Sequence, residues 1–366
     1  MKKYKLFIIA LCCYLSVNAQ KTIPNNIKGV WLTNVASEVL NSRKNIKEAV
    51  EVCKQSGINT IFVVTWNRSR TLYPSNVMNK EFGIPIMEKY QGRDPLKEVI
   101  EEAHTKGIKV YAWFEFGFSC SYKENGGIII QKHPDWAAIN KEGKLVSKND
   151  FEWMNAFDPH VQDFMMSIIT EVVKKYNIDG IQGDDRLPAL PSEAGYDKYT
   201  VSQYKIEHHD SLPPLDNKDA KWLTWRANRL NKFMERIHYE VTTLKPSLII
   251  SMAPSIFPWS KQEYLQDWPT WVKNDWVDFI CPQVYRYDFD KYKVLMNETM
   301  EQIPLAKRDK VFPGILLQVD DYNPSVTFLS QMIEQNRKLG VKGEVFFFYE
   351  GLKKNPDYFK GYAKMK

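Results

Sequence analysis

Short apolar runs alternate along the chain with segments whose apolar residues recur at helical spacing. Each run is followed by an amphipathic segment, and this order predicts a parallel sheet covered by helices. Between the second and third runs, for example, Asp94 and Pro95 provide a helix start and Gly107 a stop. The predicted strands are residues 28–34, 58–64, 108–114, 177–183, 248–252, 277–284, 311–316 and 344–348.

Eight strand–helix pairs over roughly 340 residues are typical of a (β/α)8 TIM barrel, the α/β fold that we predict. The two longest connections, residues 115–158 and 187–216, follow strands three and four, and loops of this length are usually functional. A doubly wound open sheet is the alternative, but no glycine-rich phosphate-binding fingerprint follows the first strand. We therefore predict one barrel domain over residues 20–366.

The first 19 residues have the composition of a signal peptide. Three lysines in the first five residues precede an apolar run from Leu6 to Leu15, and Val17-Asn18-Ala19 is a small-residue cleavage site. This predicts an exported protein, in the periplasm or outside the cell, without a mature membrane span because the run is too short. A lipoprotein anchored at Cys12 is disfavoured because Leu11 stands where a small residue usually precedes a lipidated cysteine.

Composition narrows the classes of partner. The net charge of +6 is spread along the chain, so it favours an anionic polymer over nucleic acid, which would need a basic run. Aromatic residues make up 13% of the chain, and rings beyond those needed for a core often stack on sugars. Cys53, Cys120 and Cys281 are too widely spaced for a disulfide framework or a zinc motif, and His208-His209 has no ligand-spaced partner. We expect no metal and no cofactor.

Polar residues gather where the predicted strands end, which is where barrel enzymes build their sites. The fourth strand ends in Asp184, Asp185 and Arg186, and the third ends in Glu115. We predict Asp184, Asp185 and Glu115 as catalytic residues. The predicted substrate-binding residues are Trp31, Asn34, Trp66, Arg68, Trp113, Arg186, Gln283, Tyr285 and Tyr349.

Paired carboxyl groups with aromatic and amide neighbours are typical of the active site of a glycosidase. One carboxyl donates a proton to the leaving oxygen, and the other attacks the sugar, stabilises it or activates water. Neighbouring strands lie about 5 Å apart, so both retaining and inverting separations are within reach. Asp184 and Asp185 would point opposite ways on a strand, so we expect one to face the barrel axis and the other to anchor a loop or pair with Arg186.

Seven ordered stretches of the chain resemble the glycosyl hydrolase-like 10 family and together span about residues 27–350. They are Gly29–Leu32, Thr71–Ser75, Ala112–Glu115, His133–Trp136, Asp179–Asp185, Trp225–Leu230 with Lys245-Pro246, and Trp276–Arg286. The resemblance implies a TIM-like barrel, export to the cell envelope, and hydrolysis of bacterial cell-wall glycan, particularly strands stripped of peptides.

Among individual residues, the resemblance implies a role for the acidic pair Asp184 and Asp185. The chain departs from many members at Gly183, where they carry an aromatic residue, and the departure suggests space for a different sugar. Some members carry Asn at the position of Glu115, so Glu115 as the proton donor is a hypothesis. We predict a glycosidase that acts on peptidoglycan or on another polysaccharide. A glycan-binding protein without turnover and a sugar deacetylase are the rivals, the latter disfavoured by the absence of a His-Asp metal cluster.

Overall fold

The computed structural model describes residue 21 and residues 25–365, so the predicted signal peptide lies outside the described residues. Eight parallel strands form its centre and are hydrogen-bonded in the order β11-β10-β9-β5-β2-β1-β13-β12. Isolated parallel bridges, Ile280 to Val311 and Gln283 to Gly314, join the two edge strands and close the ring. The predicted (β/α)8 barrel is confirmed. The strands are β1 (Lys28–Leu32), β2 (Thr60–Val64), β5 (Lys109–Phe114), β9 (Gly180–Gly183), β10 (Ile249–Met252), β11 (Phe279–Ile280), β12 (Gly314–Leu316) and β13 (Glu344–Phe347).

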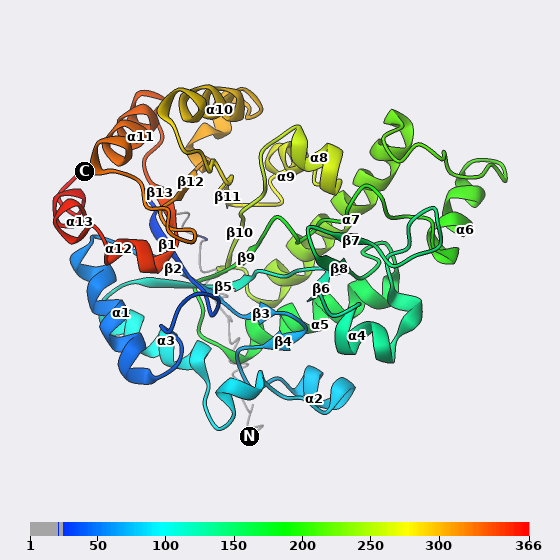
Figure 1. Ribbon diagram of the computed structural model, residues 1–366, viewed down its shortest axis with the longest axis horizontal. Coiled ribbons are helices and arrows are strands. Elements are labelled where there is room, and N and C mark those ends of the chain that lie inside the picture. Colours follow the sequence, from blue (N-terminus) through cyan, green and yellow to red (C-terminus); the bar gives the residue numbers. More distant parts are fainter. Residues whose placement is uncertain (1–20, 22–24, 366) are drawn as a thin grey trace, which may run out of the picture.

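Helices surround the strands as an outer layer (Figure 1). Their main members are α1 (Arg43–Gln55), α3 (Pro95–Thr105), α5 (Pro159–Lys175), α7 (Ala220–Leu244), α10 (Phe289–Glu301) and α11 (Val326–Lys338), with the shorter α8 (Trp259–Tyr264), α9 (Trp268–Lys273), α12 (Tyr349–Leu352) and α13 (Pro356–Tyr362). Side-chain caps fix where the main helices begin, because each accepts a backbone N–H that the helix leaves unpaired. The caps are Ser42, Asp94, Asp158, Asp219, Asp288 and Ser325. None of the helices in the described part of the chain is both long and apolar enough to span a membrane.

The connections after β2, β5 and β9 contain structure that the sequence pattern did not predict. A two-residue turn joins β3 (Trp66–Asn67) to β4 (Arg70–Thr71), and α2 (Asn76–Phe82) follows. The long loop after β5 folds into a small antiparallel sheet of β6 (Ser119–Tyr122), β8 (Phe151–Trp153) and β7 (Ser147–Lys148), with α4 (Gly127–Lys132). The loop after β9 carries α6 (Lys198–Glu207). Short 3-10 helices lie at Glu88–Tyr90, Pro134–Trp136 and Leu305–Lys310.

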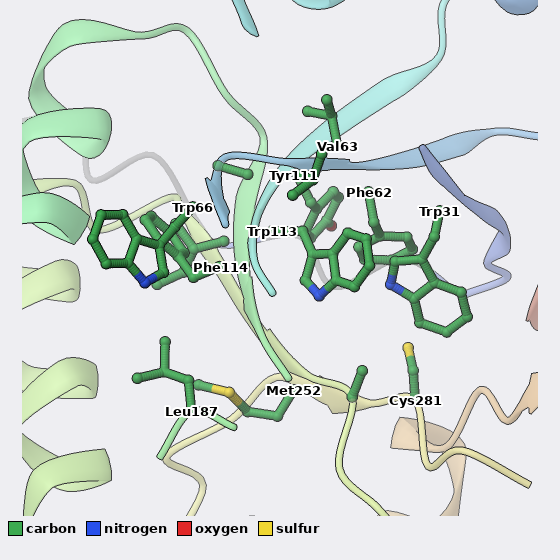
Figure 2. Packing of buried hydrophobic residues seen from close by; sticks show 14 of the residues in the cluster. Trp31, Phe62, Val63, Trp66, Tyr111, Trp113, Phe114, Leu187, Met252 and Cys281 are labelled. Atoms are coloured by element: carbon green, nitrogen blue, oxygen red, sulfur yellow. The ribbon is translucent and has the colours of Figure 1, made fainter. Parts of the chain in front are cut away.

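Aromatic side chains fill the barrel. The Trp31 ring lies 5.8 Å from that of Phe62 and 6.3 Å from that of Trp113, and Figure 2 shows these rings close to Tyr111. Tyr111 needs a glycine opposite it, because a Cβ on Gly180 would lie 2.3 Å from its ring. The packed interior therefore ends in tryptophan rings beneath the C-terminal ends of the strands.

Candidate active site

A cavity of about 210 Å³ opens at the C-terminal ends of the barrel strands. Glu115 follows β5 directly, Asp184 follows β9, and Phe347 is the last residue of β13. The residues that line the cavity are Trp31, Trp113, Glu115, Asp184, Asp185, Arg186, Gln283, Tyr285 and Phe347. All three predicted catalytic carboxyl groups thus face one space, together with five of the nine predicted substrate-binding residues.

Asp184 is the most enclosed of the three carboxyl groups, with 4% of its side chain exposed. Trp113 Nε1 donates to its Oδ2 at 2.9 Å, and Gln283 Nε2 donates to its Oδ1 at 2.7 Å. The backbone N–H of Asp185 donates to the same Oδ1 at 2.6 Å. Three donors from three different strand ends therefore fix the position of this carboxyl group.

Arg186 is the cation that the three carboxyl groups share. Its Nη2 lies 3.7 Å from Glu115 Oε1 and 3.7 Å from Asp184 Oδ2, and its Nε lies 3.7 Å from Asp185 Oδ1. The guanidinium is centred 5.1 Å from the Phe116 ring and 4.9 Å from the Phe151 ring, and Nε donates to the Glu115 carbonyl at 2.9 Å. These contacts hold it in place between the acids.

The positions of Glu115 and Asp184 follow from this shared contact. One oxygen of each lies 3.7 Å from the same nitrogen, so the two oxygens lie no more than twice that distance apart. This limit admits the retaining separation of about 5–5.5 Å and only the lower part of the inverting range of about 6.5–9.5 Å. Asn67 Nδ2 donates to the other oxygen of Glu115, Oε2, at 2.6 Å, and this leaves Oε1 on the side of Arg186.

Burial and like charge make this cluster hold protons more firmly than exposed carboxyl groups do. Burial raises the pKa of Asp184 well above its usual range, the Asp185 carboxylate raises it further, and Arg186 opposes both effects. Burial also raises the pKa of Glu115, against the lowering effects of Arg186 and the Asn67 hydrogen bond. At both Glu115 and Asp184, burial thus favours the protonated acid, whereas Arg186 favours the ionised form.

Both Asp184 and Asp185 line the cavity, although only one was expected to face the barrel axis, while Asp185 lies 3.7 Å from Arg186, the partner expected for it. β9 ends at Gly183, so the two residues lie beyond the strand and the alternation of side chains no longer applies. Asp185 is the more open, with 27% of its side chain exposed.

The space expected beside Gly183 is also filled by the protein itself. A Cβ at Gly183 would lie 2.4 Å from Met252 Sδ and 2.5 Å from the Leu187 carbonyl oxygen. The glycine therefore permits close packing of β9 on β10 and on the chain after β9, and it opens no room for a sugar.

The structure does not bring Trp66, Asn34 and Tyr349 to the cavity wall. Trp66 is fully buried against Phe164 of α5 and donates from Nε1 to the Gly117 carbonyl at 3.0 Å. Asn34 Nδ2 points to Met87 Sδ at 3.7 Å, and Tyr349 is buried in α12. In Figure 2, Trp66 lies with Phe114, apart from Trp31 and Trp113, because the chain turns outward after β2.

Two residues near the acids were not among the predicted site residues. Phe347 lines the cavity, and Asn67 orients Glu115. Asn67 could have been predicted, since it is a polar residue that closely follows the second strand. Phe347 could not, because in sequence it resembles an ordinary core residue of the last strand. Arg68, by contrast, was predicted but does not line the cavity, and it is exposed and near enough to Glu115 to lower the pKa of that carboxyl group. Among the described residues, no group of three or more His, Cys, Asp or Glu side chains is arranged to hold a metal ion.

Comparison with known sequences gives a family match over most of the chain. Residues 26–313 match the model of the family described as glycosyl hydrolase-like 10. Glycosyl hydrolase DigH of Escherichia coli K12 is 23% identical over 283 residues, which cover 71% of this chain and 62% of DigH. Glycosyl hydrolase YngK of Bacillus subtilis 168 is 22% identical over 379 residues, covering 93% of this chain and 71% of YngK. The chain thus matches less than two thirds of the length of DigH.

Solved structures support the fold. The glycoside hydrolase domain of PgaB (BpsB) from Bordetella bronchiseptica has a TM-score of 0.69 at 14% identity, covering 93% of this chain and 99% of that domain. The catalytic domain of β-amylase from Paenibacillus polymyxa has a TM-score of 0.64 at 11% identity, covering 94% and 100%. At these identities the likeness concerns the architecture of a TIM-barrel glycosidase.

Proposed function

The chain belongs to the glycosyl hydrolase-like 10 family, and from this premise we propose that it is an exported glycoside hydrolase. Its proposed reaction is the cleavage of O-glycosidic bonds in peptidoglycan glycan strands by carboxyl acid and base catalysis. The observation that carries the proposal is the convergence of Glu115, Asp184 and Asp185 on Arg186 in one cavity at the strand ends.

The three acids suit different parts of such a reaction. Glu115 has a raised pKa, and in the described residues no hydrogen-bond donor occupies its Oε1, so it can carry a proton to the leaving oxygen. Asp185 is the most open and can attack the sugar or activate water. Asp184, fixed by three donors, orients Asp185 through its backbone N–H and, in its ionised form, stabilises the positive charge that develops on the sugar ring.

Further features support a cell-wall glycan as the substrate. Tyr285 is a partly exposed aromatic ring in the cavity wall, where a sugar ring can stack, and the buried Trp31 and Trp113 rings form the floor beneath it. The two sequence relatives carry the name glycosyl hydrolase, the chain begins with a predicted signal peptide, and its net charge of +6 suits an anionic polymer.

Purified mature protein incubated with peptide-free peptidoglycan strands tests this function. We expect soluble saccharides, read by mass spectrometry, at a rate that a chelator leaves unchanged. A panel of other β-linked polysaccharides is assayed in parallel to identify the substrate. Products from one of these alone would contradict the proposal that peptidoglycan is the substrate. Acetate released without shortening of the strands would indicate a deacetylase. Strands that bind but are never cut would identify a glycan-binding protein.

A further inference from the structure

The hairpin of β3 and β4 holds an unusual turn beside the cavity. Its two central residues, Arg68 and Ser69, have φ angles of 46° and 55°. Positive φ at both positions is the pattern of a type I′ turn, which ordinarily uses Asn-Gly or Asp-Gly because other side chains are strained there. Non-glycine residues kept in this conformation are concentrated at functional sites.

The rest of the hairpin is fastened to the protein. Trp66 Nε1 donates to the Gly117 carbonyl at 3.0 Å, and the buried Ser69 hydroxyl donates to the Cys120 carbonyl. Arg70 pairs with Glu88 at 3.0 Å, and Asn67 reaches Glu115. Only Arg68 is exposed among the six residues from Trp66 to Thr71. The hairpin therefore presents one guanidinium from a fixed position.

Arg68 lies on a row of aromatic rings that leads into the cavity. Its guanidinium is 5.3 Å from the centre of the Tyr122 ring, which lies 5.0 Å from the Phe151 ring, and Phe151 in turn supports Arg186 at 4.9 Å. Arg68 is also near enough to Glu115 to lower the pKa of that carboxyl group. The rings of Tyr122 and Phe151 thus lie between the exposed Arg68 and Arg186, and Arg68 stands at the edge of the acidic cluster.

The neighbouring cations already have carboxylate partners. Arg186 serves the three acids of the cavity, and Lys123, which shares the Tyr122 ring, pairs with Asp150 at 3.3 Å. Within residues 25–365, no carboxylate pairs with Arg68, and its side chain makes no hydrogen bond to this part of the chain. The carboxyl groups of the cavity would repel an anionic group on the substrate. Arg68 is placed to offset that repulsion.

We propose that Arg68 forms a carboxylate-binding subsite beside the acidic cavity, which takes a carboxylate carried by the sugar next to the scissile bond. The inference rests on the proposed glycosidase function and names a feature of its substrate. A guanidinium binds carboxylates through two parallel N–H donors, and the Tyr122 ring behind it restricts its orientation. The lactyl group of a muramic acid without peptide and the carboxylate of a uronic acid share this chemistry.

The test compares peptide-free peptidoglycan strands with the same strands after their carboxyl groups are converted to neutral methylamides. Wild type, Arg68→Gln, Arg68→Lys and a control, Arg43→Gln, are assayed on both. Arg43 lies on α1, pairs with Glu102 at 2.9 Å and does not line the cavity, so its loss removes the same charge outside the site. We expect wild type and Arg43→Gln to prefer the free carboxylate about 10-fold in kcat/KM, mainly through KM. Arg68→Gln loses this preference, and Arg68→Lys keeps part of it.

Equal use of both strands by wild type, or an undiminished preference in Arg68→Gln, would overturn the subsite. Binding of both strands, followed by tryptophan fluorescence, separates this outcome from failure of the glycosidase function. If neither strand is cut, a binding preference that depends on Arg68 still supports the subsite, and its absence overturns it. Hyaluronan added as a competitor identifies the source, because competition that Arg68→Gln abolishes indicates a uronate, whereas no competition indicates the lactyl carboxylate.

Discussion

Glu115 experiences opposing influences on its pKa. Burial raises it, whereas Arg186 and the hydrogen bond from Asn67 lower it. As a proton donor, Glu115 must be protonated when substrate is bound, so activity falls as the pH rises through its pKa. The residues around Glu115 therefore set the alkaline side of the pH–rate profile.

Replacing Asn67 tests this balance. The amide favours the charged form of Glu115, so Asn67→Ala raises the pKa of Glu115 and keeps the acid protonated to higher pH. We predict that the alkaline limb of kcat/KM against pH moves upward, alongside some loss of rate because Glu115 is less firmly placed. Asn297→Ala, on the outer helix α10, serves as a control and leaves the profile unchanged. An alkaline limb that stays in place or moves downward in Asn67→Ala would contradict Glu115 as the proton donor.

Single residues of the site differ in how far sequence could predict them. Glu115 and Asp184 stand directly after strands and Arg186 follows two residues later, so their place at the strand ends followed from the pattern. That Asp184 and Asp185 share one cavity did not follow, because it depends on β9 ending at Gly183. Trp66 also stands near a strand end, but a buried ring and a stacking ring have the same signature in sequence.

Among the secondary-structure elements, the eight barrel strands were predictable because most are short, largely apolar runs and almost all of their residues are buried. β11 is shorter than predicted, since Pro282 has no N–H to give to a neighbouring strand. The strands that escaped prediction, β3, β4, β6, β7 and β8, have two to four residues each, too few for a period to show.

Arg226 of α7 fastens the long loop after β9. Its guanidinium is buried and donates to the carbonyls of Ser192, Ala194 (2.7 Å) and Asn217 (2.6 Å), while it stacks on Trp222 at 4.3 Å. Burial lowers the pKa of Arg226 to about 9. A buried cation paired mainly with carbonyl groups is costly, and here it supplies the donors that this loop cannot find within itself.

We predict that Arg226→Met frees the loop at residues 187–216. The buried carbonyl groups of Ser192 and Ala194 and the partly buried one of Asn217 lose their donor, which lowers the free energy of unfolding by about 3 kcal/mol. Limited proteolysis should cut this loop under conditions in which wild type stays whole. Arg236→Met, on the same helix, loses only partly exposed pairs with Asp163 (2.7 Å) and Glu240 (2.6 Å) and changes little. Equal resistance of Arg226→Met and wild type would show that the loop is held by other contacts.

In the molecule as a whole, stabilising contacts gather at one end of the barrel and the candidate catalytic residues at the other. At the N-terminal end of the strands, the fully buried Glu344 receives hydrogen bonds from Arg337 at 2.9 and 3.0 Å and from the Tyr362 hydroxyl. Lys28 donates there to the Tyr362 carbonyl at 3.2 Å and so ties the first strand to the last helix. The acids at the opposite end are thus supported by a ring closed between its first and last strands.

The most direct test of this account is the rate of glycan cleavage by Asp184→Asn and Glu115→Gln beside wild type and a surface control, Glu298→Gln. Circular dichroism and melting temperature establish that each variant is folded. We predict a loss of at least about 100-fold in kcat for Asp184→Asn and Glu115→Gln, with strand binding retained and Glu298→Gln unchanged. Wild-type rates in both cavity variants would contradict the claim that the acidic cluster at the strand ends performs the reaction.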